Sequence, residues 1–298
     1  METNTTVTKK ILFFVNPVSG PGKTNWNDTI RNYFHQQPEQ IEIVTIEKEA
    51  TSEQLREKIN AIKPDIAVAV GGDGTIKLVG ESLMDTEIPL GILPAGSANG
   101  MAKELGIPSD PEAAMQLLVT GRPRTIHLLR VNGHVCIHLS DIGYNADLIR
   151  HYEQQSGRGK WGYLRAAVKA LFRHPVMEVF MVVANEKLEL RAAMVVLANA
   201  TMYGSGVVIN PLGNLDDALF EVVVIKKISA IEIFKMRFLQ VAFNPEKTKL
   251  YQTDRLHIRS KRLVHFQVDG EYLGKVKSVE ASLLPAALQV LVPKEDTQ

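Results

Sequence analysis

Three glycines that enclose an aspartate follow an apolar stretch of strand length. Residues 66–70 contain only isoleucine, alanine and valine, which favours a strand buried on both faces of a parallel sheet. The next residues are Gly71-Gly72-Asp73-Gly74-Thr75. Such glycines free backbone N–H groups to turn toward a phosphate, and Thr75 would open a helix with its positive dipole end. The stretch predicts a phosphate-binding loop, although a tight strand-to-helix turn capped by an aspartate would also explain it.

Asp73 is the one charged group in this loop. A carboxylate beside phosphates is repulsive on its own, so it indicates a Mg²⁺ ion, a substrate hydroxyl to deprotonate, or both. Two other loops rich in small residues, at 16–24 and 94–100, also follow predicted strands. Loops at the carboxyl ends of parallel strands lie together, where ligands bind. The three loops could therefore share one nucleotide.

Two acidic stretches in the second half of the chain are further candidates. Asn214-Leu215-Asp216-Asp217 places adjacent carboxylates in a turn before a strand, which suits a hard-cation site and a solvated turn equally well. Asp269-Gly270-Glu271 follows an apolar strand. By itself, a hairpin turn built on Asp-Gly explains this second stretch better than a catalytic role does.

Several familiar motifs are absent or out of context. Gly22-Lys23-Thr24 ends like a Walker A loop, but Pro17 stands where the first glycine is required. The glycines at 157, 159 and 162 match the dinucleotide fingerprint by spacing, yet no buried strand precedes them, so we expect a plain loop. The chain contains neither His-Glu-x-x-His nor Gly-x-Ser-x-Gly, which argues against a zincin or an α/β-hydrolase.

The composition is that of a soluble globular protein that can bury a sizeable core. The chain has 298 residues, 45% of them hydrophobic and 22% charged, and a formal net charge of +1. This near-neutral charge provides no global attraction to nucleic acid, so we expect no nucleic-acid partner. The single cysteine, Cys136, excludes an intrachain disulfide and fits a reducing cytoplasm. We see no signal peptide or membrane span, so any contact with a membrane would be peripheral.

The arrangement of predicted elements indicates an α/β fold with two domains. Strand and helix signals alternate over residues 1–123, which is typical of a doubly wound, nucleotide-binding parallel sheet; Thr45 ends its second strand and Thr51-x-x-Gln54 caps a helix. Beyond a boundary near Arg124, residues 124–287 show strand-like runs, one of them at 135–139, which predicts an antiparallel β-rich domain. Two helical segments, near 161–173 and 229–243, interrupt these strands.

The first of these helical segments carries cations at a four-residue spacing. Arg165, Lys169 and Arg173 would form a basic face beside apolar residues, and Lys226 and Lys227 precede the second segment. Such a face can lie on an anionic membrane surface. A solvated basic face over an ordinary core stripe explains the spacing at least as well.

Taken together, the loops resemble a known family of lipid kinases. Five motifs in family order span nearly the whole chain: Asn16-Pro17-x-Ser19-Gly20, Gly71 to Thr75, Pro94-x-Gly96-Ser97-x-Asn99, the segment 211–217, and Val268-Asp269-Gly270-Glu271. This set is similar to the diacylglycerol kinase catalytic family, which includes bacterial soluble lipid kinases, sphingosine kinases and ceramide kinases. The resemblance implies an N-terminal nucleotide domain, a lipid-binding β-rich domain, ATP held in the cleft between them, and a C-terminal segment 288–298 that returns to the first domain.

The resemblance also assigns roles to individual residues. Asp73 would organise Mg²⁺ and the phosphates; Asp269 would be the general base with Glu271 beside it, although in the sphingosine kinase branch the counterpart of Asp73 has that role. A structural Mg²⁺ site would use Asp217, with Asp216 and the backbone of Asn214 and Leu219 nearby. The residues that would contact ATP are Asn16, Ser19, Gly20, Thr45, Gly72, Asp73, Gly74, Thr75, Ser97 and Asn99.

This chain departs from the family pattern at three places. Lys77-Leu78 replaces Asn-Glu after the Gly-Gly-Asp-Gly-Thr motif, Gly100 replaces the aspartate that many bacterial members have, and Ala218 follows Asp217 in place of glycine. These differences bear on the lipid substrate more than on the fold. We therefore expect an ATP- and Mg²⁺-dependent kinase of a diacylglycerol-like or sphingoid lipid. The alternatives are a catalytically impaired regulator of the same fold and, less favoured, an NAD kinase. The sequence is compatible with a homodimer but does not fix the oligomeric state.

Overall fold

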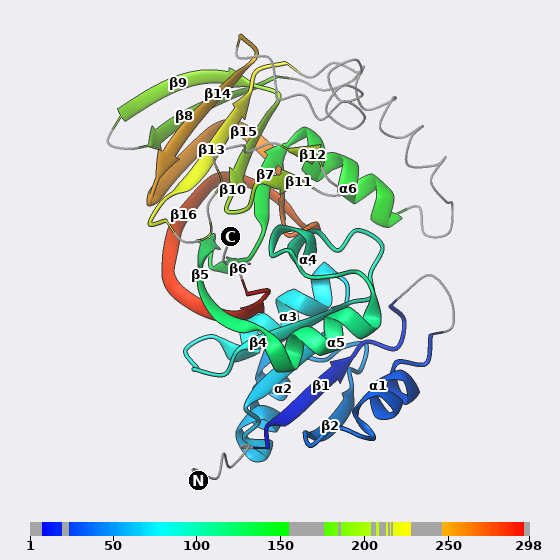
Figure 1. Cartoon of the computed structure of the whole chain (residues 1–298). Coiled ribbons are helices and arrows are strands. Elements are labelled where there is room, and N and C mark those ends of the chain that lie inside the picture. The colour runs from blue at the N-terminus through cyan, green and yellow to red at the C-terminus, as the bar shows by residue number, and fades with distance from the viewer. Residues whose placement is uncertain are drawn as a thin grey trace. The chain divides into compact units, whose positions relative to one another are not determined.

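The structure is a computed structural model that describes residues 8–19, 24–154, 176–183, 186–203, 207–208, 213, 215, 217–227 and 246–294 (Figure 1). The chain divides into two compact units: Met1–Ile126 together with Ala286–Gln298, and His127–Pro285. The first is α/β and the second is β-rich, which confirms the predicted fold class. The assignment of functions to domains stays a prediction: a nucleotide-binding domain at 1–123, to which 288–298 return, and a lipid-binding domain at 124–287.

The first unit is built on a parallel sheet with the order β4-β3-β1-β2. Its strands are β1 (Lys10–Val15), β2 (Gln40–Thr45), β3 (Ile66–Gly71) and β4 (Leu90–Pro94). The end of the long strand β16 (Glu271–Val292) adds a parallel neighbour through the pair Val290 and Leu90. Every residue of β3 is buried, as a strand covered on both faces requires.

The helices in the described part of this unit are α1 (Trp26–Phe34), α2 (Ser52–Ile62), α3 (Asp73–Leu83), α4 (Gly100–Glu104) and α5 (Pro111–Thr120). Helices α1 and α5 pack on one face of the sheet in a cluster that includes Phe13, Ile30, Val68 and Leu118. Helix α3 packs against β3 and β4, and α2 packs against α3. The capping box predicted at the start of α2 is present, because Thr51 and Gln54 exchange side-chain to backbone hydrogen bonds.

The second unit is an antiparallel sheet with the order β14-β13-β10-β7-β15-β16; β8 also pairs with β15 and β9, and β5 with β16 and β6. Helix α6 (Tyr144–Gln154) follows β7. A short pair, β11 (Met202–Tyr203) and β12 (Val207–Val208), lies apart from this sheet. The sheet strands are β5 (Arg122–Val131), β6 (His134–Cys136), β7 (Leu139–Gly143), β8 (Met177–Val183), β9 (Glu186–Ala192), β10 (Met194–Ala198), β13 (Phe220–Ile225), β14 (Thr248–Thr253) and β15 (Arg255–Val268).

Two hairpins of this unit turn on residues with positive φ. Asn132-Gly133, with φ of 48° and 85°, joins β5 to β6, and Asp269-Gly270, with φ of 50° and 86°, joins β15 to β16. Two consecutive positive φ values are the signature of the type I′ turn that these dipeptides favour. The structure therefore has the hairpin that Asp-Gly predicts from the sequence.

Some elements differ from those expected. The predicted strand 135–139 is split into β6 and β7, because the N–H groups of residues 137–139 point to the carboxylate of Asp269 and not to a partner strand. Helices α4 and α6 were not predicted. The expected helical segments near 161–173 and 229–243, with Arg165, Lys169 and Arg173, and the glycine loop at 157–162 lie outside the described residues. Within the described ranges, no helix is long and apolar enough to cross a membrane.

Candidate active site

The loops after β1 and β3 meet at the carboxyl edge of the parallel sheet. The Asn16 side-chain Nδ2 donates a hydrogen bond to Thr75 Oγ1 at 3.0 Å, and the Asn16 backbone N donates to the Val70 carbonyl oxygen at 3.0 Å. Parallel strands deliver both loops to the same edge, and these bonds hold them in contact. The structure thus brings together two of the three loops that the sequence singled out.

The third loop lies against the Gly-rich loop through two glycines. The Ala95 N donates to the Gly71 carbonyl oxygen at 2.9 Å. A Cβ added to Gly96 would lie 2.5 Å from Gly72 Cα and 2.8 Å from Asn99 Oδ1, which is closer than real Cβ atoms approach. The Asn99 carboxamide also accepts a hydrogen bond from Gly96 N at 2.8 Å. Backbone therefore packs directly on backbone, and only glycine fits at position 96.

Asp73 connects the same two loops by its carboxylate. It is the first residue of α3 and half-buried. Its Oδ2 accepts a hydrogen bond from Gly100 N at 3.1 Å, and its Oδ1 accepts one from Met101 N at 3.0 Å, both at the start of α4. Each carboxylate oxygen has a second lone pair, so an oriented Asp73 can still bind a cation.

The remaining nucleotide candidates line the same sheet edge with different exposure. Ser19 donates its backbone N to the Asn16 carbonyl oxygen at 3.2 Å. Thr45 ends β2 beside Val15 and is exposed, as are Gly74 and Ser97. A Cβ added to Gly74 would meet nothing within 4 Å, so that position faces open space. Gly20 lies outside the described residues.

Asp269 has a different setting in the second unit. Its carboxylate accepts hydrogen bonds from the backbone N of Ile137 (3.1 Å), His138 (2.9 Å) and Leu139 (3.2 Å), and the Cys136 thiol lies 3.6 Å away. Its own N donates to the Leu139 carbonyl oxygen at 2.8 Å. The side chain is thereby fixed in orientation and satisfies donors in the gap between β6 and β7. Glu271, next along the chain, is exposed.

A buried polar network that sequence reasoning missed supports this turn. Gln267 is fully buried; its Nε2 donates to Asp141 and its Oε1 accepts from Gly270 N at 2.7 Å. Asp141, also fully buried, accepts further hydrogen bonds from Asn145 Nδ2 (2.7 Å) and Ala146 N (3.0 Å). The network ties the start of α6 to the Asp269-Gly270 turn. No local spacing could have revealed it, because Asp141 and Gln267 are far apart in the chain.

A second missed cluster lies on the same hairpin. His265 Nδ1 is 2.8 Å from the Tyr272 hydroxyl, and His265 Nε2 is 3.1 Å from Asp147 Oδ1 on α6. Arg150 NH2 lies 2.8 Å from the same Asp147 oxygen. These side chains join α6 to β15 and β16 close to the turn that carries Asp269. No sequence pattern singled out His265, which connects the Tyr272 hydroxyl to the Asp147 carboxylate.

The predicted structural Mg²⁺ site is described only in part. Asp217 Oδ1 accepts a hydrogen bond from Leu219 N at 3.2 Å, while Asn214 and Asp216 lie outside the described residues. Among the residues that the structure does describe, no group of three or more His, Cys, Asp or Glu could hold a metal ion. A carboxylate with backbone carbonyls is an all-oxygen donor set, which suits Mg²⁺ chemically. The site stays a prediction.

Comparison with known families identifies this chain. The profile of the diacylglycerol kinase catalytic domain matches residues 10–131, and that of the YegS C-terminal NAD kinase beta sandwich-like domain matches residues 140–292. The chain belongs to the diacylglycerol kinase catalytic family, as the five motifs indicated. It is a lipid kinase, that is, a phosphotransferase.

Individual relatives agree with this assignment. A protein of Mycobacterium tuberculosis named diacylglycerol kinase is 25% identical over 299 residues, which cover 96% of this chain and 96% of the relative. A Yersinia pseudotuberculosis protein named "Probable lipid kinase YegS-like" is 30% identical over 245 residues, 76% of this chain and 78% of its own length. The crystal structure of a diacylglycerol kinase from Bacillus anthracis str. Sterne has a TM-score of 0.71 at 19% identity, covering 96% of this chain and 98% of that one, and so shares the fold.

Proposed function

We propose that this protein transfers the γ-phosphate of ATP to a hydroxyl of a diacylglycerol-like or sphingoid lipid at an anionic membrane surface. The observation that carries the proposal is the junction of the three loops of the first unit, where Asp73 accepts hydrogen bonds from Gly100 and Met101. Phosphoryl transfer depends mainly on positioning and on stabilising charge. A glycine-rich loop edge with one oriented carboxylate is suited to both tasks.

In this proposal the first unit holds ATP with Mg²⁺. Gly72 to Thr75, whose glycines leave the backbone accessible, would bind the phosphates, and Asp73 would hold a Mg²⁺ ion that would neutralise phosphate charge. Asn16 orients Thr75 by its hydrogen bond. The other nucleotide contacts are assigned to Ser19, Gly20, Thr45, Ser97 and Asn99.

The second unit contributes the acceptor chemistry. Asp269 is the proposed base for the lipid hydroxyl, with Glu271 beside it, and the backbone N–H groups of residues 137–139 keep its carboxylate in one orientation. A base must lie within hydrogen-bond reach of the proton it removes, so a fixed orientation favours the task. Asp217, Asp216, Asn214 and Leu219 are the proposed structural Mg²⁺ ligands.

The membrane part of the proposal rests on the cations of the sequence. The protein would bind an anionic bilayer peripherally from the cytoplasmic side. The contact would be made by the cations Arg165, Lys169 and Arg173. Vesicle binding should then weaken as salt screens the charges, and salt-insensitive binding would contradict this part. Analytical ultracentrifugation would test whether the protein forms the homodimer with which its sequence is compatible.

Two observations favour second candidates. The C-terminal domain matches a family that is NAD kinase beta sandwich-like, so NAD should also be tested as the phosphate acceptor. Gly100, whose backbone N donates to Asp73, stands where many bacterial members have an aspartate. The missing carboxylate, together with Lys77-Leu78, favours a regulator that binds ATP without turnover.

One assay separates the three functions. The protein is incubated with radiolabelled ATP, Mg²⁺ and mixed lipid vesicles, and in parallel with NAD. Labelled lipid supports the proposal. Labelled NAD, or ATP binding without any labelled product, would replace it with the corresponding second candidate.

A further inference from the structure

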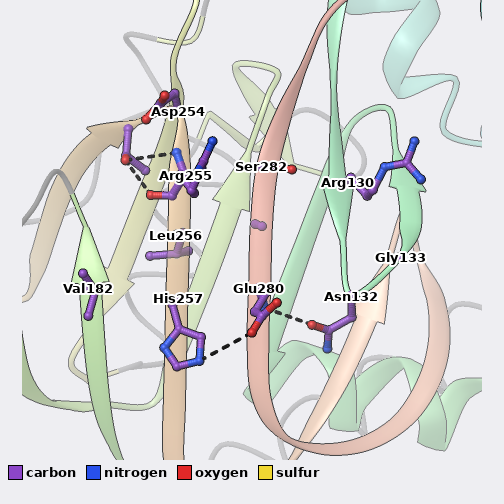
Figure 2. Close-up of a pocket in the computed structure, with 12 residues that line it drawn as sticks. Arg130, Asn132, Gly133, Val182, Asp254, Arg255, Leu256, His257, Glu280 and Ser282 are labelled. Carbon is purple, nitrogen blue, oxygen red and sulfur yellow. Dashed lines mark hydrogen bonds and ion pairs between the residues drawn. The ribbon is translucent and has the colours of Figure 1, made fainter.

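The second unit has a pocket of about 890 Å³ on strands β15 and β16 and the β5–β6 hairpin, far in sequence from the nucleotide loops. Figure 2 shows its lining on neighbouring strands, with Val182 of β8 at one side and Arg130 and Gly133 at the other. The volume is within the range of small-molecule sites. All lining residues belong to the second unit, so the pocket can be understood from that unit alone.

The strand register places three lining residues in one row. Arg255 and Ser282 are direct partners across β15 and β16. Asn132 N donates to the Glu280 carbonyl oxygen at 2.9 Å, and a Cβ on Gly121 would lie 3.0 Å from the Val292 carbonyl oxygen, so β5 runs antiparallel to β16. Arg130 is therefore level with Ser282 on the other side, as Figure 2 shows. Ser282 lies between two arginines on adjacent strands.

The polar side chains of the next row of the pocket already interact with other groups of the protein. His257 and Glu280 are direct cross-strand partners, with 3.9 Å between His257 Nε2 and Glu280 Oε1. Glu280 N donates to Asn132 Oδ1 at 2.9 Å, and Asn132 Nδ2 donates to the Ser278 carbonyl oxygen at 3.1 Å. Among the described residues, by contrast, neither the guanidinium of Arg130 nor that of Arg255 forms an ion pair, and both side chains are exposed. The free hydrogen-bond donors are thus concentrated around Ser282.

We propose that this pocket binds a single phosphate ester group, held over Ser282 by the guanidinium groups of Arg130 and Arg255. Arginine presents a planar fork of N–H donors that matches phosphate oxygens, and such charge-assisted bonds are strong. Asp254 and Glu280 also line the pocket and offset the two cations, which disfavours polyphosphates and nucleic acid. The group can come from a phospholipid head or from a soluble phosphate ester, and Val182 offers an apolar wall to the rest of the ligand.

The test uses the full chain without ATP and two probes with the same phosphate monoester. Calorimetry with glycerol 3-phosphate measures the soluble source, and co-sedimentation with phosphatidylcholine vesicles that contain phosphatidic acid measures the lipid source. We expect Arg130→Gln and Arg255→Gln each to weaken binding of at least one probe by about tenfold. The matched control is Arg259→Gln, an exposed arginine two strand positions beyond His257 that does not line the pocket.

The pattern across the variants decides the result. Loss in the two pocket variants with the control within about twofold of wild type supports the site, and the probe that shows the loss identifies the source. Equal loss of binding in all three arginine variants would indicate nonspecific electrostatic attraction. Binding that is unchanged in Arg130→Gln and Arg255→Gln would indicate a site at the nucleotide loops or the basic segment 161–173. Either result overturns the proposal. Absence of binding of both probes overturns it as well. Thermal unfolding of each variant checks that the exposed substitutions leave the fold intact.

Discussion

Asp73 and Asp269 are anchored in similar ways but in different surroundings. Both are half-buried carboxylates that follow the buried end of a strand, and both accept hydrogen bonds from backbone N–H groups of a loop distant in sequence. Asp73 takes its two donors from the start of a short helix, beside the exposed Gly74. Asp269 takes three from the gap between two strands, which it fills. We infer that Asp73 is freer for function, whereas Asp269 also maintains structure.

The largest effect is expected for Asp73→Ala. The variant loses the carboxylate proposed to hold Mg²⁺, so lipid phosphorylation should fall at least about a hundredfold. Its two hydrogen bonds are part-buried, so the free energy of unfolding should change by less than about 2 kcal/mol. Initial rates and urea unfolding measure the two quantities. A wild-type rate in a folded variant would remove Asp73 from the mechanism.

Gly96→Ala tests the loop junction around Asp73. The new Cβ would lie 2.5 Å from Gly72 Cα, which is backbone and cannot rotate away. The two loops must separate, at a cost of about 1–3 kcal/mol, and the KM for ATP should rise about tenfold or more. Gly74→Ala is the control for stability only, because its Cβ meets no atom within 4 Å. Its melting temperature should stay unchanged, and since Gly74 is itself a proposed phosphate contact, a raised KM for ATP would support phosphate binding at that position.

Asp269→Asn should affect stability as well as rate. An amide has one acceptor oxygen, so its NH₂ group must face one of the three N–H donors of residues 137–139. We expect a loss of about 1–3 kcal/mol in unfolding free energy together with slower phosphorylation. Glu271→Gln, at an exposed position, serves as the stability control. If Asp269→Asn kept both the rate and the stability of wild type, the contrast with Asp73 would disappear.

Gln267→Met probes the support of the turn without touching Asp269. The change keeps the volume but removes the donor to Asp141 and the acceptor for Gly270 N, both of which are in a buried network. Unsatisfied buried polar groups should lower the free energy of unfolding by about 1–3 kcal/mol. The control is Gln116→Met on the exposed face of α5. Equal stability of the two variants would show that the network does not hold the turn.

The smallest effect is expected for Glu178, an exposed carboxylate whose hydrogen-bond partner is a side chain and not backbone N–H groups. The hydrogen bond and charge of Lys261 lower the pKa of Glu178 below its ordinary value of 4.5. Lys261→Gln should return that pKa toward 4.5, as NMR titration would show. Because the folded pKa is depressed, any stabilisation exists above the unfolded pKa and is lost as pH falls through the folded one. Both side chains are exposed, so unfolding should not change measurably, unlike for Asp269.

Patterns of residues close in the chain predicted many of the strands, helix caps and turns. The buried strand before Gly71, the capping box at Thr51 and the Asp269-Gly270 hairpin depend on residues close in the chain, and all three are present. The meeting of the three loops was also expected, because parallel strands end at one edge.

Tertiary partners decided the rest. The strand expected at 135–139 breaks because Asp269, more than a hundred residues away, takes its N–H groups. The networks around Gln267 and His265 depend on α6, whose own sequence contained no signal that we used. The identity of the lipid substrate also depends on residues that only the fold brings together, so the motifs did not predict it.

The most direct test of the account is the Mg²⁺-dependent transfer of label from γ-³²P-ATP to lipid in vesicles, measured side by side for wild type and Asp73→Ala, with ATP binding measured by calorimetry on both. The account predicts a labelled phospholipid with the wild type and its loss in the variant, while the variant remains folded. Wild-type protein that binds ATP but labels no lipid under these conditions would contradict it.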